Sequence, residues 1–168
     1  EGLDDLRRML AEELRRDLSP AGRVARTLQS VGDDPDAAFA ATLDLHAESI
    51  ASLRRSVTAS QFRAAVEHVV QAGRVGVFGL GPSSAMADYL AIQLGRFGLD
   101  TLTLTESGLL LADRLLHLRP GDLLIVMAYG RVYPELRALF DRADALGVPR
   151  ILMTDTLGGE IGGRADLV

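Results

Sequence analysis

The first third of the chain repeats its apolar residues at helical spacing. From Leu3 to Leu18 leucines recur every three or four positions, with acidic residues early and arginines late, as suits an amphipathic helix and its dipole. A second helical pattern covers Pro20 to Val31, and Asp34-Pro35 then supplies a cap and a first residue for another helix. The pattern therefore predicts three successive helices before residue 60.

The third of these helices carries an apolar seam. Its residues are spaced alternately by four and three positions, which predicts contact with another helix, within the chain or across a dimer. They are Phe39, Leu43, His46, Ile50, Leu53 and Val57. Thr58-Ala-Ser60 then predicts the cap of a fourth helix over Gln61 to Ala72. We expect its inner face to consist of Phe62, Ala65, Val66 and Val69.

After Gly73 short, continuously apolar runs alternate with segments of helical pattern. The runs cover Val75 to Leu80, Thr101 to Thr105, Leu123 to Tyr129 and Ile151 to Thr154, and Ala165 to Val168 begins a fifth. Strands that alternate with helices form a parallel sheet with right-handed crossovers, and continuously apolar strands are covered by helices on both faces. The prediction is a doubly wound α/β domain with a parallel five-stranded, flavodoxin-like sheet, preceded by an α-helical linker.

Composition and charge narrow the function classes. The 168 residues carry a formal net charge of -5, which opposes binding of nucleic acid or an anionic membrane by bulk attraction. The chain has no cysteine, and its histidines lack metal-ligand spacing, so we propose no metal site. No apolar run approaches the roughly 20 residues that span a bilayer, and no secretion signal opens the chain. We expect a cytoplasmic protein without membrane contact.

The most specific motif is GLGPSSAM, from Gly79 to Met86, which joins a predicted strand to a predicted helix. In open α/β sheets ligands bind at the carboxyl ends of strands, where helix N-termini attract anions. Gly81 permits a tight turn, and Ser83 and Ser84 add hydroxyls, so a phosphate or carboxylate suits this site. A dinucleotide fingerprint would need glycine at position 84, and Ser83 serving only as a helix cap is the simpler alternative.

The segment from Ala65 to Val168 resembles the sugar isomerase (SIS) domain of RpiR/MurR-type transcription regulators. The resemblance rests on VEHVVQAGRVGVFGLGPSSAMADYLAIQLGRFG, RPGDLLIVMAYGRVYPELRALFDRADALGVPRILMTDT and GGRADLV. In addition, GLDDLRRMLAEELRRDLSP is similar to the last helix of the family's helix-turn-helix domain, and ATLDLHAESIASLRRSV to its linker helix. This implies a truncated helix-turn-helix domain at 1–19, linker helices at 20–60, and a C-terminally truncated SIS effector-binding domain at 61–168.

Such regulators sense a phosphorylated sugar with the SIS domain and bind operator DNA through the helix-turn-helix domain. The resemblance therefore implies a non-enzymatic effector-sensing and oligomerisation region, forming a homodimer or homotetramer, without a cofactor. Operator DNA would be bound by the missing N-terminal domain. One alternative is an aldose-ketose phosphate isomerase, for which Glu106, His117 and Glu135 do not form a recognisable acid and base set. Another is a ligand-free dimerisation module whose pocket is filled by Met127, Tyr129 and Tyr133.

The second phosphate loop is where this chain departs from the family. The usual Ser-x-Ser-Gly-x-Thr is here MAYGRV, residues 127 to 132, so three hydroxyls are replaced. Each hydrogen bond to an ionised group contributes about 1.5–3 kcal/mol, a loss that the guanidinium of Arg131 can offset. The ligand is then an anion held by Arg131, a different compound, or absent. The predicted ligand-binding residues are Gly81, Ser83, Ser84, Glu106, Tyr129, Gly130, Arg131 and Tyr133, with no catalytic residue.

Overall fold

The computed structural model describes residues 34–155 and 157–168, which divide into two compact units at Thr58 and Ala59. Predictions for residues 1–33, including the first two helices and the helix-turn-helix remnant, lie outside the described residues. In the first unit helix α3 (Pro35–Ser56) begins as expected, because the Asp34 carboxylate accepts a hydrogen bond of 3.0 Å from the Asp36 N–H. No helix in the described ranges is long and apolar enough to cross a membrane.

Helix α3 exposes its apolar seam. None of the residues on α3 is buried, and the side chains of Phe39 and Ile50 are 67% and 70% exposed. The seam lies on a helix as predicted, and Val57 forms its C-cap. Contact between this seam and a second helix stays a prediction.

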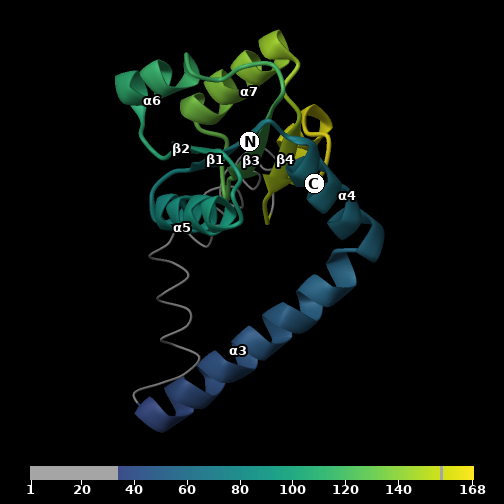
Figure 1. Ribbon diagram of the computed structural model, residues 1–168. Helices are drawn as coiled ribbons and strands as arrows, with labels where there is room; N and C mark the ends of the chain where they lie inside the picture. The colour runs from purple at the N-terminus through teal and green to yellow at the C-terminus, as the bar shows by residue number, and fades with distance from the viewer. Residues whose placement is uncertain (1–33, 156) are drawn as a thin grey trace, which may run out of the picture. The chain divides into compact units, whose positions relative to one another are not determined.

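The second unit contains a parallel sheet with strands in the order β2-β1-β3-β4. These are β1 (Arg74–Gly79), β2 (Thr101–Leu104), β3 (Asp122–Met127) and β4 (Arg150–Met153), all shown in Figure 1. The doubly wound α/β class is confirmed. The fifth strand is not formed in the described residues: the 3-10 helix η1 (Gly162–Arg164) leaves only the last residues beside β4, where Leu167 makes one parallel bridge to Ile151.

Helices cover both faces of the sheet. Helices α4 (Ala59–Gln71) and α5 (Pro82–Arg96) pack on one face, whereas α6 (Gly108–Leu115) and α7 (Pro134–Leu146) pack on the other (Figure 1). The short helix α8 (Gly158–Ile161) follows β4. The core of the first face includes Val75, Val77, Ala87, Ala91, Leu123 and Ile125, and that of the second Phe78, Leu104, Leu124, Val126, Leu136, Leu139 and Phe140.

The inner face of α4 is narrower than the sequence pattern indicates. Ala65, Val69 and Ala72 pack against the core, but Phe62 and Val66, which we expected there, are 65% and 45% exposed. The two exposed residues lie about 50 and 90° to one side of the contacting stripe, given 100° of rotation per residue. A helix that touches a sheet along one line buries only that line, so apolar character alone overestimated the buried face.

An ion pair joins the amino ends of the two central strands. A guanidinium Nη2 of Arg74, the first residue of β1, lies 2.7 Å from a carboxylate oxygen of Asp122, the first residue of β3. The same Asp122 oxygen accepts a hydrogen bond from the Arg119 N–H at 2.8 Å, and Arg74 also donates to the carbonyl of His117. Asp122 is only 6% exposed, so removing Arg74 would leave a nearly buried carboxylate without its cation.

The β1–α5 turn depends on a glycine at the end of the strand. A Cβ on Gly79 would lie 2.4 Å from the carbonyl oxygen of Ser83 and 2.8 Å from its carbonyl carbon. Both atoms belong to the backbone of the first turn of α5, so they cannot rotate away. The helix therefore begins so close to β1 because position 79 has no side chain.

Replacing this glycine should destabilise the domain. We expect Gly79→Ala to lower the free energy of unfolding by about 1–3 kcal/mol through overpacking against the helix backbone. Gly159→Ala is the matched control, since a Cβ there meets nothing within 4 Å and should change stability by about 0.5 kcal/mol or less. Urea unfolding of both variants measures the difference. Equal stabilities would show that the turn has room for a side chain.

Candidate ligand-binding site

The order of the strands makes the loops that follow β1 and β3 diverge at the carboxyl edge of the sheet. From β1 the chain crosses to β2 on one side, and then to β3 on the other side of β1. Gly79 pairs in register with Met127, so the two loops leave the sheet side by side. Ligands of open α/β sheets bind at such a point, where successive connections diverge. The predicted residues 81, 83 and 84 of the first loop thus share this edge with 129 to 133 of the second.

The first loop leaves one serine hydroxyl available. Gly81, with φ +59°, is the N-cap of α5, and no side chain caps the helix, so Ser83 is not its cap. The Ser84 hydroxyl donates a hydrogen bond of 2.7 Å to the Gly81 carbonyl within the loop. Within the described ranges the Ser83 hydroxyl makes no hydrogen bond. Ser83 is therefore the hydroxyl that can donate to a ligand at the positive end of the α5 dipole.

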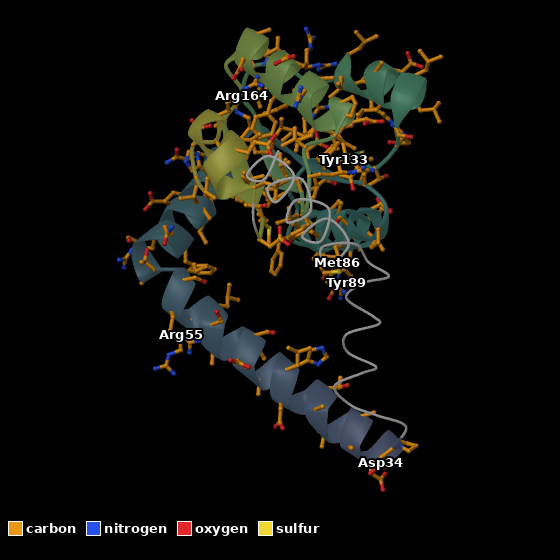
Figure 2. All side chains as sticks on the ribbon, turned by 180° about the vertical axis from the view of Figure 1, so that it is seen from behind. Asp34, Arg55, Met86, Tyr89, Tyr133 and Arg164 are labelled. Atoms are coloured by element: carbon orange, nitrogen blue, oxygen red, sulfur yellow. The ribbon has the colours of Figure 1, made fainter. Side chains whose placement is uncertain are left out.

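The second loop turns at Gly130, whose φ is +77°. The Gly130 N–H donates a hydrogen bond of 3.3 Å to a carboxylate oxygen of Asp155, which follows β4. The Arg131 guanidinium carbon lies 4.6 Å from the centre of the Tyr133 ring, a cation–π contact. Tyr133, which is labelled in Figure 2, is the N-cap of α7. The loop thus presents one cation, held over an aromatic ring.

Tyr129 sits between apolar and acidic surroundings. Burial, and secondly the negative charge of Asp155, raise the pKa of the Tyr129 phenol above its ordinary value of 10.0. The phenol is therefore neutral at physiological pH, so its O–H remains a hydrogen-bond donor. Its side chain is not enclosed, since the residue is 42% exposed. Sequence reasoning did not select Asp155; the signal was the TDT triplet that follows the fourth strand.

Glu106 lies apart from the second loop. It follows β2, and β1 separates that strand from β3. One Glu106 carboxylate oxygen lies 3.3 Å from Nε of Arg114 on α6, and the other accepts a hydrogen bond of 3.2 Å from the Thr105 N–H. The Glu106 carboxylate thus forms an ion pair with Arg114. The sequence reasoning missed Arg114, because the pattern of α6 does not show which acidic residue this arginine pairs with.

The three residues considered for isomerase chemistry are not brought together. His117 lies at the amino edge of the sheet, where its carbonyl accepts a hydrogen bond from Arg74 at the start of β1. Glu106 and Glu135 follow β2 and β3 at the carboxyl edge. Among residues 34–155 and 157–168 no group of three or more His, Asp or Glu side chains could hold a metal ion.

The sequence profile of the SIS domain matches residues 68–168, so the chain belongs to the SIS domain family. No curated protein sequence matches it. The SIS domain of an RpiR transcription factor from Sphaerobacter thermophilus is 32% identical, with a TM-score of 0.66 over 76% of this chain and 73% of that one.

Two further solved structures share the fold. A protein from Listeria monocytogenes, assigned provisionally to the sugar-phosphate isomerases, is 24% identical, with a TM-score of 0.71 over 82% of this chain and 73% of that one. The NanR protein of Vibrio vulnificus, solved with ManNAc-6P, is 21% identical, with a TM-score of 0.69 over 86% of this chain and 53% of that one. The neighbours of this SIS domain thus include a transcription factor and a protein assigned provisionally to the isomerases.

The pKa of Tyr129 offers a test of the second loop. We expect Tyr129 to titrate above pH 10, and Asp155→Asn to lower its pKa partly, since burial remains. A pKa raised in the folded state means that stability falls as the pH rises above about 10, and Tyr129→Phe should reduce this fall. Phenolate absorbance follows the titration. A Tyr129 pKa at or below 10.0, taken from the difference between the titrations of the unsubstituted chain and Tyr129→Phe, would show that the environment assigned to Tyr129 is wrong.

Proposed function

We propose that this chain is the effector-sensing and oligomerisation region of a bacterial helix-turn-helix transcription regulator of the RpiR/MurR type. The effector is a sugar phosphate or a related small anion. The carrying observation is the free Ser83 hydroxyl at the uncapped start of α5, beside the Arg131 loop, at the edge where SIS-fold ligands are expected. The 32% identity to an RpiR-factor SIS domain favours a regulator over an enzyme.

The anionic group would bind at the start of α5. There the Ser83 hydroxyl donates and the helix dipole adds a positive potential, while the N–H groups of Ser83 and Ser84 already donate to the carbonyls of Leu80 and Gly81. Arg131 would approach from the second loop, leaving its stacked position over Tyr133 or extending from it. Because Asp155 already accepts the Gly130 N–H and carries a negative charge, the second loop contributes less to an anion than the hydroxyl-rich loop of the family would.

Two aromatic rings would complete the site. Tyr129 and Tyr133 flank Arg131 in the chain, and both leave part of their surface accessible. A sugar ring can pack its apolar face on such a ring, while the neutral Tyr129 O–H donates to a hydroxyl. The exposure of Tyr129 disfavours the alternative in which the tyrosines fill the pocket of a ligand-free dimerisation module.

Regulation requires that the effector bind two arrangements of the oligomer unequally. An effector that prefers one arrangement of paired SIS domains shifts the population toward it by the ratio of its two affinities. Linker helices would carry this difference to DNA-binding domains on operator DNA. The resemblance of residues 20–60 to the linker of the family supports this route.

Ligand binding is tested by thermal unfolding with sugar phosphates, the same sugars without phosphate, and small carboxylates. A ligand at 100 times its Kd adds about 2.7 kcal/mol, so the true effector raises Tm clearly. We expect a shift with a phosphorylated sugar or a carboxylate, and its reduction in Ser83→Ala and Arg131→Ala. Arg63→Ala, an exposed charge on α4, is the control and keeps the full shift. A shift unchanged in the Ser83 and Arg131 variants would contradict the site.

The isomerase alternative makes a separate prediction. An aldose-ketose isomerase moves the proton at C2, and exchanges it with solvent. Because Glu106 is paired with Arg114 and His117 lies at the opposite edge of the sheet, we expect no deuterium incorporation at C2 of the bound sugar phosphate in D₂O. Proton NMR of the ligand measures it. Incorporation that depends on the protein would overturn the non-enzymatic proposal.

A further inference from the structure

The outer side of helix α5 is apolar and uncovered. Met86, Tyr89, Ile92 and Phe97 are 58%, 58%, 62% and 83% exposed, whereas Ala87 and Ala91 on the opposite side are buried against the sheet. Figure 2 shows Met86 and Tyr89 on the side of α5 that faces away from the sheet. An apolar surface of this kind on a folded domain is typical of an interaction site.

The charges on this helix face indicate what covers it. Asp88, Ile92 and Arg96 are spaced by four residues, so they follow one another along the exposed side, about 6 Å apart in height. Both charged side chains are exposed, and neither makes an ion pair within the described residues. The acidic and the basic residue thus lie at equal distances on either side of Ile92. The same face on a second, antiparallel copy of the helix would therefore place opposite charges level with one another.

A second pair of residues has the same symmetry. Tyr89 and Gly95 lie three residues before and after Ile92. A Cβ on Gly95 would meet nothing within 4 Å, so the helix surface there is open. When two copies of α5 pack antiparallel about an axis beside Ile92, the bulky Tyr89 of one copy stands level with the glycine of the other. The partner's arginine at position 96 also comes level with that ring, as a cation–π contact requires.

We propose that two copies of this chain associate through an antiparallel contact between their α5 helices, with a two-fold axis beside Ile92. Asp88 of each copy then stands level with Arg96 of the other, so two ion pairs flank an apolar centre of isoleucine and tyrosine. This deepens the oligomerisation part of the proposed function and is independent of the effector.

Electrostatics selects this arrangement over a parallel one. In a parallel pair Asp88 would face Asp88 and Arg96 would face Arg96, and like charges across an interface disfavour a pairing. The antiparallel pair uses the same patch on both copies, so the assembly closes at two subunits across this interface. Ser83 also lies in the first turn of helix α5, which places the candidate ligand site and the contact between copies on one rigid element.

Charge exchange provides the sharpest test, measured by sedimentation equilibrium without effector. We expect Asp88→Arg and Arg96→Asp each to raise the dimer Kd about tenfold or more, because each variant faces itself with like charges. An equimolar mixture of the two variants should dimerise again, as should the double variant, because opposite charges meet in both. Asp113→Arg, an exposed charge on α6, is the control and should leave the Kd unchanged.

The lack of cysteine in the chain allows a second measurement. Ile92→Cys places one thiol per copy next to the proposed axis, so mild oxidation should yield a covalent dimer much faster than Asp113→Cys does. A chain that stays monomeric, a dimer indifferent to the charge variants, or equal crosslinking at positions 92 and 113 would each overturn the proposal. Circular dichroism establishes that every variant is folded. An effector that binds while these tests fail would leave the sensing proposal standing and remove only the contact.

Discussion

Strand β1 lies between β2 and β3, and this central pairing determines where each candidate residue lies. Parallel strands must all end at one edge of the sheet, and connections that leave β1 and β3 toward opposite faces separate at that edge. Gly79 makes the arrangement compact, because only a residue without a side chain lets α5 begin against the end of β1. The rest of the site follows from that start: an uncapped helix end on one face and the Arg131 loop on the other.

The strands could be predicted from the sequence because a strand that is buried on both faces is apolar at consecutive positions. Continuous apolar runs marked all four strands to within about two residues, and Asp34-Pro35 marked the start of α3. The pattern failed where apolar residues do not pack inside their own unit. Phe62 and Val66 read as core residues, yet the contact of α4 with the sheet is a single line. A hydropathy pattern records that a residue is apolar, but not which surface covers it.

The two loops of the candidate site could be predicted from the sequence, but the hydrogen bonds and ion pairs around them could not. Gly81, where we expected a tight turn, adopts a positive φ, as does Gly130, and topology puts their loops side by side. The bond from the Gly130 N–H to Asp155 and the pairing of Glu106 with Arg114 join segments far apart in the chain, so no local spacing encodes them. Ser83 and Ser84 look equivalent in the sequence, and only the Ser84 hydroxyl bond to Gly81 distinguishes their roles.

The ion pair of Arg74 with Asp122 joins the two central strands at their amino ends, the edge opposite the loops of the candidate site. This ion pair therefore supports the pairing of β1 with β3 at a distance from the candidate site. The exposed positions 129 and 131 of the second loop can then change without loosening this end of the sheet, so the candidate site can vary while the scaffold stays constant.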